Sequence, residues 1–186
     1  MVTILSLWLP IVLSAAAVFV VSSLIHMVMS YHKTDFKGLP DEARVMDALR
    51  PLAIPPGEYL MPFAKSNEER KSPEFAAKVK QGPIAFLNFL PGGSFGMGPA
   101  LAQWFGYSLV VGIVVGYLLS RFLDPGTGYL EVFRFAGTVA FAAYAMALWQ
   151  NSIWYKRSWS TTLKSTFDGL VYALVTAGIF GWRWPA

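Results

Sequence analysis

A run of 28 residues from Ile4 to Tyr31 contains no Asp, Glu, Lys or Arg. An apolar helix of about 20 residues is long enough to cross the hydrocarbon core of a bilayer. The segment can therefore span a membrane with some tilt. A cleaved signal peptide is the competing interpretation, but such peptides have a basic start and a much shorter apolar stretch. We expect the segment to be retained as a transmembrane helix.

Charged residues are few and unevenly placed. They make up 14% of the chain, whereas hydrophobic residues make up 55%, and 17 of the 26 charged residues lie between His32 and Gln81. A charge at the centre of a bilayer costs about 3 kcal/mol or more, so the nearly uncharged stretches on either side indicate membrane spans. The pattern predicts an all-α membrane protein with four transmembrane helices.

The boundaries of the four spans follow from the apolar runs. We predict transmembrane helices at residues 4–31, 99–123, 129–155 and 166–184, with an insert at 32–98. Eight prolines divide this insert into short pieces, and its few large apolar residues make a weak core. Within it, Ser72-Pro73-Glu74 predicts the start of a helix, because a hydroxyl can cap the helix and proline fits its first turn. Residues 84–90 are predicted to form a strand or an interfacial segment.

Lys and Arg residues near the span ends predict the orientation, because they collect on the cytoplasmic side of a membrane. Three lie on one side, namely Arg121, Arg134 and Arg183. Eight lie on the other side, namely Lys33, Lys37, Arg44, Arg50, Lys80, Lys156, Arg157 and Lys164. This asymmetry places the insert in the cytoplasm and both termini on the outer side of the membrane. The net charge of +4 forms no continuous basic stripe, so we expect the lipid bilayer, and not nucleic acid, as the partner of the positive charges.

Small residues recur at helix-packing spacing in two spans, where they let helix backbones approach closely in lipid. They are Gly112 and Gly116 in the second span, and Gly169, Ala173, Ala177 and Gly181 in the fourth. Such stripes pack either within the chain or against a partner membrane subunit or a second copy of the chain. The sequence leaves both alternatives open.

Several polar residues are expected at similar depth in the cytoplasmic leaflet, namely His26, His32, Gln150, Asn151 and Asp168. They form a hydrogen-bonded cluster that fixes helix register, a site for a proton, an ion or a ligand, or simply a set of solvated groups at the interface. If Asp168 and His26 meet, they would form a pair stabilised as ions. His26 and His32 are six residues apart, about 120° off a common helix face. They cannot bind one metal ion unless the helix breaks between them, so we predict no metal and no cofactor. The chain has no cysteine, which excludes disulfides and thiolate metal sites.

Two stretches, SSLIHMVMSYHKTDFKGLPDEARVMDALR (residues 22–50) and QNSIWYKRSWSTTLKSTFDGLVYALVTAGIFGWRWP (residues 150–185), resemble a group of uncharacterised bacterial inner-membrane proteins. The resemblance implies a bacterial inner-membrane setting and no particular activity. Because no catalytic motif is visible, we expect a non-catalytic accessory or scaffold subunit of a membrane complex. The alternatives are a small oligomeric transporter or channel component, and a membrane-embedded enzyme that acts on lipid or quinone with His26, His32 and Asp168 as acid–base groups.

Overall fold

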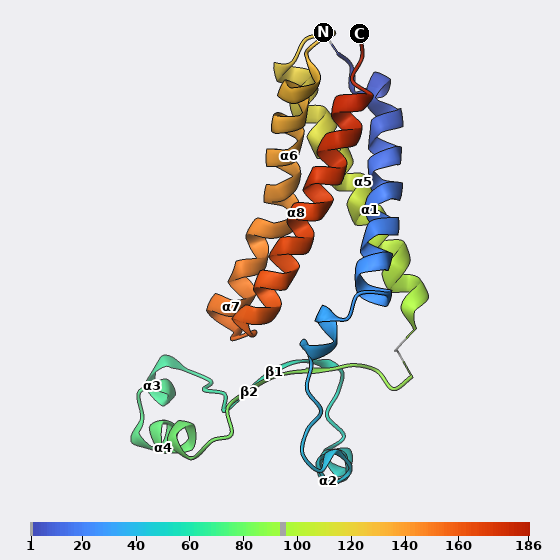
Figure 1. Ribbon diagram of the computed structural model, residues 1–186. Coiled ribbons are helices and arrows are strands. Elements are labelled where there is room, and N and C mark those ends of the chain that lie inside the picture. Colours follow the sequence, from blue (N-terminus) through green and yellow to red (C-terminus); the bar gives the residue numbers. More distant parts are fainter. Residues whose placement is uncertain (1, 94–95) are drawn as a thin grey trace. The chain divides into compact units, whose positions relative to one another are not determined.

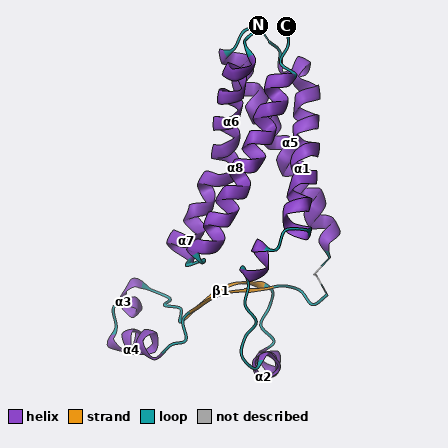
Figure 2. Cartoon of the chain, in the orientation of Figure 1, coloured by secondary structure: helices purple, strands orange, loops and turns teal. Residues whose placement is uncertain are grey.

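The computed structural model describes residues 2–93 and 96–186 and is mostly helical (Figures 1 and 2). It divides into two compact units. The helical unit comprises Met1–Lys37 and Met97–Ala186, and the insert unit comprises Gly38–Gly96. Each unit is described by itself below.

The helical unit contains four helices that are long and apolar enough to cross a membrane. They are a first helix formed by the 3₁₀ turn η1 (Ile4–Leu7) and α1 (Trp8–Met27), then α5 (Met97–Phe122), a third helix formed by α6 (Tyr129–Ala145), the 3₁₀ turn η4 (Met146–Leu148) and α7 (Trp149–Tyr155), and finally α8 (Trp159–Trp182). By length and composition, the chain is a multi-pass membrane protein.

The four helices form a ring of neighbours: α1 packs against α5 and α8, and α6 packs against the same two helices. Their shared core contains mostly small or branched apolar side chains, such as Val18, Val115, Leu119 and Ala140. Aromatic side chains such as Phe180 complete it. Large apolar side chains such as Leu24, Val110 and Leu174 are exposed on the outside. A protein in water would bury these side chains, whereas lipid tails can cover them.

The small residues of α5 and α8 lie against helices of the same chain. A Cβ atom at Gly169 would come within 2.9 Å of the Ala145 Cβ atom, and one at Gly181 would come within 2.8 Å of the Tyr129 ring. In α5, Cβ atoms at Gly112 and Gly116 would each meet the Ile11 side chain at 3.3 Å. Ala173 and Ala177 are buried as well. These six positions are therefore contact points within the helical unit.

Two helix boundaries differ from the sequence-based expectation. The fourth helix starts at Trp159, before the expected residue 166. Its first turns are polar, but their hydroxyl groups form hydrogen bonds inside the helix. The Ser165 and Thr166 hydroxyls donate to main-chain carbonyls four residues earlier, at 3.0 and 2.8 Å, a bond that lets such residues sit inside a helix. The first helix ends at Met27, before the expected residue 31.

Both ends of the chain approach the same end of the four-helix ring, where α1 begins and α8 ends (Figure 1). The segment after α8 is attached there. The Trp184 indole donates to the Asp124 carbonyl at 3.0 Å, and the Gly126 amide donates to the Pro185 carbonyl at 2.9 Å. Together these bonds join the C-terminal segment to the turn between α5 and α6.

The insert unit consists of short elements: α2 (Glu42–Leu49), the 3₁₀ turn η3 (Arg50–Leu52), β1 (Gly57–Met61), α3 (Asn67–Arg70), α4 (Pro73–Gln81) and β2 (Ala85–Phe89). The two strands pair antiparallel, with Gly57 opposite Phe89 and Met61 opposite Ala85. The predicted helix start at Ser72 is confirmed, because its side chain accepts a hydrogen bond from the Phe75 amide. None of the described residues of this unit is fully buried.

Candidate functional site

The site begins where the chain leaves α1. This helix ends at Met27, and after a short turn the chain forms the 3₁₀ turn η2 (Tyr31–Thr34). The change of direction brings the rings of His26 and His32 together, with their centroids 4.5 Å apart. On one continuous helix these two rings would have pointed about 120° apart. The helix break therefore creates a histidine pair that the sequence spacing alone argues against.

Two carboxylates flank His32. Its Nε2 atom lies 2.8 Å from Asp168 on α8, and its Nδ1 atom lies 2.6 Å from Asp35. His32 and Asp35 are three residues apart on a 3₁₀ turn, where such positions lie one above the other. The Tyr31 hydroxyl donates a hydrogen bond to the other oxygen of Asp168. Asp168 thus forms hydrogen bonds with two neighbouring residues of η2, Tyr31 and His32.

Lys164 holds η2 against α8. Its ammonium group donates to the Tyr31 carbonyl at 2.6 Å, to the Thr34 hydroxyl at 2.8 Å and to Asp35 at 2.9 Å. Lys164 and Asp168 are four residues apart on α8, so their side chains share one face of that helix. We call His26, Tyr31, His32, Asp35, Lys164 and Asp168 the polar cluster. Four of its ionisable side chains are linked by hydrogen bonds, in the order Lys164, Asp35, His32 and Asp168.

His26 is exposed, but the rest of the cluster is partly or fully removed from solvent. The Asp168 residue is 3% exposed, and the Asp35 side chain is 8% exposed. Burial alone would raise the pKa of the Asp35 carboxyl, but its hydrogen bonds to His32 and Lys164 outweigh this effect and leave the pKa below its usual value. Burial, together with the hydrogen bond to Asp168, raises the pKa of the Tyr31 hydroxyl. Tyr31 is therefore a neutral hydrogen-bond donor, and Asp35 is an ionised acceptor.

A cavity of about 430 Å³ opens beside the cluster, between α1, α5, η4 and α8. His26 and Asp168 line it. The remaining walls are mainly apolar or aromatic and include Met27, Leu101, Trp104, Tyr144, Leu148 and Tyr172. Trp104, Tyr144 and Tyr172 contact one another ring to ring, with centroids 5.6 to 6.2 Å apart. The cavity thus has a broad aromatic wall and one ionisable end.

Of the five polar residues singled out from the sequence, three are brought together: His26, His32 and Asp168. The histidine that forms a hydrogen bond with Asp168 is His32, whereas the sequence suggested His26. Gln150 and Asn151 lie on α7, and neither side chain joins the polar cluster through a hydrogen bond in the described part of the chain.

Sequence analysis did not single out Tyr31, Asp35 or Lys164 as site residues. Two spacings in the sequence are compatible with contacts between these residues and the predicted ones. One is the i, i+3 pair of His32 and Asp35, and the other is the i, i+4 pair of Lys164 and Asp168. The second pair becomes visible only if the fourth helix begins before residue 164.

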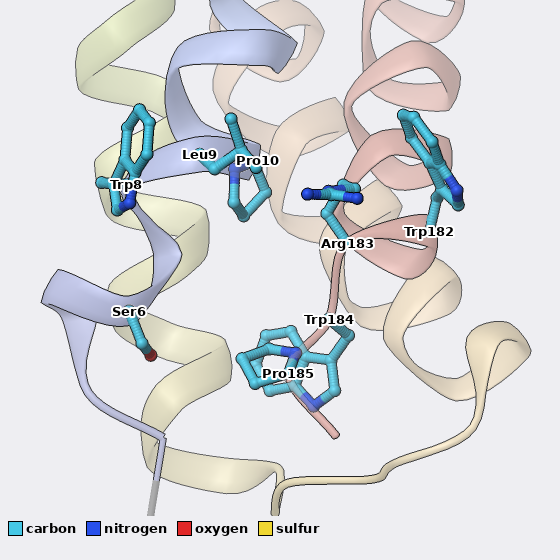
Figure 3. A pocket seen from close by; sticks show the side chains of 8 residues that line it. All are labelled: Ser6, Trp8, Leu9, Pro10, Trp182, Arg183, Trp184 and Pro185. Atoms are coloured by element: carbon cyan, nitrogen blue, oxygen red, sulfur yellow. The ribbon is translucent and has the colours of Figure 1, made fainter.

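A second, smaller hollow of about 350 Å³ lies at the other end of the helical unit, where the first helix begins and α8 ends (Figure 3). Its lining residues are Ser6, Trp8, Leu9, Pro10, Trp182, Arg183, Trp184 and Pro185. The Arg183 guanidinium stacks on the Trp182 ring at 5.1 Å from its centroid. Tryptophan and arginine side chains of this kind are typical of a membrane–water interface. No carboxylate or histidine lines this hollow, so the acid–base groups belong to the polar cluster.

No protein-family model, no curated protein and no solved structure matches the chain.

Proposed function

We propose that this chain is a membrane protein that binds a quinone-like molecule in the cavity beside the polar cluster. The observation that carries the proposal is the cavity itself: aromatic and apolar walls, with His26 and Asp168 at one end. Ligand sites of this kind combine an apolar surface with a few polar groups that fix the orientation of the ligand. In a membrane protein, a ligand with an apolar tail can enter such a cavity from the lipid phase.

The charges around the cavity favour a quinone head over a phospholipid head group. Its lining residues include the carboxylate of Asp168 and no Lys or Arg. A phosphate group would face a like charge there without a matching cation, whereas cations are what recognise phosphate. A quinone carbonyl is neutral and needs only hydrogen-bond donors. The flat faces of Trp104, Tyr144 and Tyr172 offer stacking surfaces for its ring.

The polar cluster supports proton exchange with the bound head group. The His26 ring makes no hydrogen bond in the described part of the chain, so its N–H can donate to a ligand carbonyl. Asp168, also in the cavity wall, is linked through His32 to Asp35. This row of hydrogen-bonded groups provides a route for a proton between the cavity and the end of η2. The proposal covers binding and proton exchange only.

We also propose that the protein lies in the bacterial inner membrane with its insert unit in the cytoplasm and both termini in the periplasm. The Lys and Arg asymmetry supports this orientation. The polar cluster then lies in the cytoplasmic leaflet. A role as an accessory subunit of a larger membrane complex is compatible with quinone binding, because such a subunit can hold a quinone that another subunit reduces or oxidises.

A binding titration tests the proposal. The chain is purified in mild detergent with a chelator present, and a short-chain ubiquinone is added while tryptophan fluorescence is recorded. Trp104 lines the cavity, so we expect saturable quenching with one site per chain. Ala100 also lines the cavity, whereas Ala102 is exposed and does not. Ala100→Phe should fill the site and weaken binding about tenfold or more, and Ala102→Phe is the matched control.

Two outcomes would overturn the proposal. One is quenching that does not saturate, or that is the same in the wild type and in Ala100→Phe. The other is displacement of the quinone by an equimolar anionic phospholipid, which would identify the occupant as a lipid.

A further inference from the structure

We infer that His26, His32 and Asp168 form a binding site for a divalent transition-metal ion such as Zn²⁺. The helix break after Met27 brings His26 and His32 together, although their spacing on one continuous helix would keep them apart. One nitrogen from each histidine and one oxygen from Asp168 lie within 4.8 Å of one another. The inference goes beyond the proposed quinone site and does not depend on it, because the ion is assayed alone.

The three ligand atoms need only a small adjustment to bind one ion. Histidine nitrogens and carboxylate oxygens bind Zn²⁺ at about 2.0–2.2 Å, so two of its ligands lie at most about 4.4 Å apart. The Nε2 atom of His32 is already 2.8 Å from Asp168. His26 is exposed and forms no hydrogen bond through its ring in the described part of the chain. The His26 side chain therefore has no hydrogen bond among the described residues to lose when it moves toward the other two ligand atoms.

His32 is held in the orientation that a metal ligand requires. Its Nδ1 atom faces Asp35 at 2.6 Å, so a proton on Nδ1 can be donated to that carboxylate, and Nε2, which lies 2.8 Å from Asp168, is the nitrogen that would bind an ion once the ion displaces its proton. A histidine that donates its second N–H to a carboxylate is the usual arrangement around protein-bound metals. Asp35 is itself fixed by Lys164 at 2.9 Å. Asp35 and Lys164 are therefore positioning residues for the site.

The donor set indicates the class of ion. Two imidazoles with one carboxylate suit Zn²⁺, Fe²⁺ or Co²⁺, whereas Mg²⁺ and Ca²⁺ prefer oxygen ligands alone. Three protein ligands leave a fourth coordination position open, which is the composition of metal sites that bind a further ligand. His26 and Asp168 both line the cavity, so the open position faces it.

The test measures metal binding by the purified protein in mild detergent, with a purification tag that contains no histidine. The chain has only two histidines and no cysteine, so binding through nitrogen or sulfur has few other sources. Zn²⁺ is titrated by calorimetry, and Co²⁺ by the visible absorption bands of its coordinated form. We expect one ion per chain. His26→Gln and His32→Gln should each weaken binding at least tenfold, and Asp35→Asn should weaken it by about 10- to 100-fold.

His26→Gln is the deciding variant. Because the His26 ring forms no hydrogen bond in the described part of the chain, this variant should fold with an unchanged melting temperature. Gln150→Ala, on the exposed surface of α7, is the control and should bind Zn²⁺ like the wild type. Folded His26→Gln with unchanged Zn²⁺ affinity would overturn the inference, as would a wild type that binds no stoichiometric ion. Quinone binding in chelator is a separate measurement, so either proposal can fail without the other.

Discussion

The Nε2 atom of His32 lies 2.8 Å from a carboxylate oxygen of Asp168, although 136 residues separate them in the chain. This contact joins the turn after the first membrane helix to the fourth. Because both ring nitrogens of His32 face carboxylates, the imidazole lies between two acids and is fixed in position. The predictions below test the contacts that hold this arrangement together.

Lys164→Met should destabilise the protein, because Lys164 makes two hydrogen bonds to η2 and a third to the buried carboxylate of Asp35, the next residue after it. We expect a loss of about 2 kcal/mol in the free energy of unfolding. Lys156→Met is the matched control, since Lys156 is exposed and, among the described residues, donates only to the Ile153 carbonyl. Its effect should stay within about 0.5 kcal/mol. The measurement is thermal unfolding in detergent. Equal effects of both substitutions would contradict the role of Lys164.

Asp35→Asn should remove a pH-dependent part of the stability. The pKa of Asp35 lies below its usual value of 3.8, because its hydrogen bonds to His32 and Lys164 outweigh the effect of burial. A carboxyl with a lowered pKa stabilises the folded state above its unfolded pKa, and this stability is lost as the pH falls through the folded pKa. We therefore expect the wild type to exceed Asp35→Asn in stability at neutral pH. The gap should stay constant down to about pH 4 and narrow below it.

The measurement for Asp35 is thermal unfolding of both proteins between pH 7 and about pH 3, with a chelator present to keep metal from the cluster. Glu58→Gln is a useful comparison, because Glu58 is exposed and lies in the insert unit. A gap between wild type and Asp35→Asn that widens on acidification would show that the carboxyl is not stabilised as an ion.

The membrane helices could be predicted from the sequence because the bilayer imposes a condition that a linear sequence reveals. A helix that crosses hydrocarbon must be long and nearly free of charge. The run Ile4–Tyr31 and the confinement of most charges to residues 33–80 satisfy that condition directly. Four candidate membrane helices in the structure match the predicted number.

The site could be predicted only in part, because its geometry depends on two helix ends that carry weak signals. No Gly or Pro lies between Met27 and His32, so nothing in the sequence indicates that the first helix stops at Met27. A continuous helix separates the two histidine rings, so the spacing alone predicts no shared metal ion. In the same way, the polar residues 159–165 resemble a loop, and the sequence pattern does not predict that Lys164 shares a helix face with Asp168.

Gly169→Ala should destabilise the helical unit. A Cβ atom at residue 169 would lie 2.9 Å from the Ala145 Cβ atom and 3.3 Å from the Ala145 Cα atom. Since neither atom belongs to a flexible side chain, α8 must move away from α6, and we expect a cost of roughly 1–3 kcal/mol. Gly178→Ala is the control on the same helix, because a Cβ atom there would be 3.8 Å from its nearest neighbour. Better helix propensity should make that variant neutral or stabilising, by up to about 1 kcal/mol.

Thermal unfolding in detergent compares the two glycine variants with the wild type. Ala173→Leu provides a second probe of the same surface, because Ala173 is 1% exposed, and Leu174→Ile on the exposed side of α8 is its control. If Gly169→Ala and Gly178→Ala had the same melting temperature, the close contact between α6 and α8 would not limit stability.

The proposed orientation predicts which positions an impermeant thiol reagent can reach in intact cells. The chain has no cysteine, so single cysteines report without further changes. Gly128→Cys lies in the turn between α5 and α6, and Ala186→Cys lies at the C-terminal end. Both should be labelled from outside. Lys78→Cys, exposed on α4 of the insert unit, should be labelled only after the cells are opened. The reverse pattern would place the insert unit in the periplasm.

A double-mutant cycle decides which histidine is coupled to Asp168. In the described part of the chain, His32 forms a hydrogen bond to Asp168, whereas His26 forms none and contacts the ring of His32. Residues in contact or in one hydrogen-bond network show coupling energies of about 0.5–3 kcal/mol. We therefore expect His32→Gln and Asp168→Asn to be coupled by at least about 1 kcal/mol. The coupling energy between His26→Gln and Asp168→Asn should be smaller, because these two residues share no direct hydrogen bond among the described residues.

The cycle is measured as the free energy of unfolding in detergent with a chelator, so that a bound ion does not couple the three residues. Adding Zn²⁺ then provides an internal comparison, because an ion shared by His26 and Asp168 couples them even though they share no hydrogen bond. The expected result is therefore a coupling energy between His26 and Asp168 that is larger in Zn²⁺ than in chelator. Stronger coupling of Asp168 to His26 than to His32 in chelator would show that the first helix continues past Met27, contrary to the geometry on which the polar cluster rests.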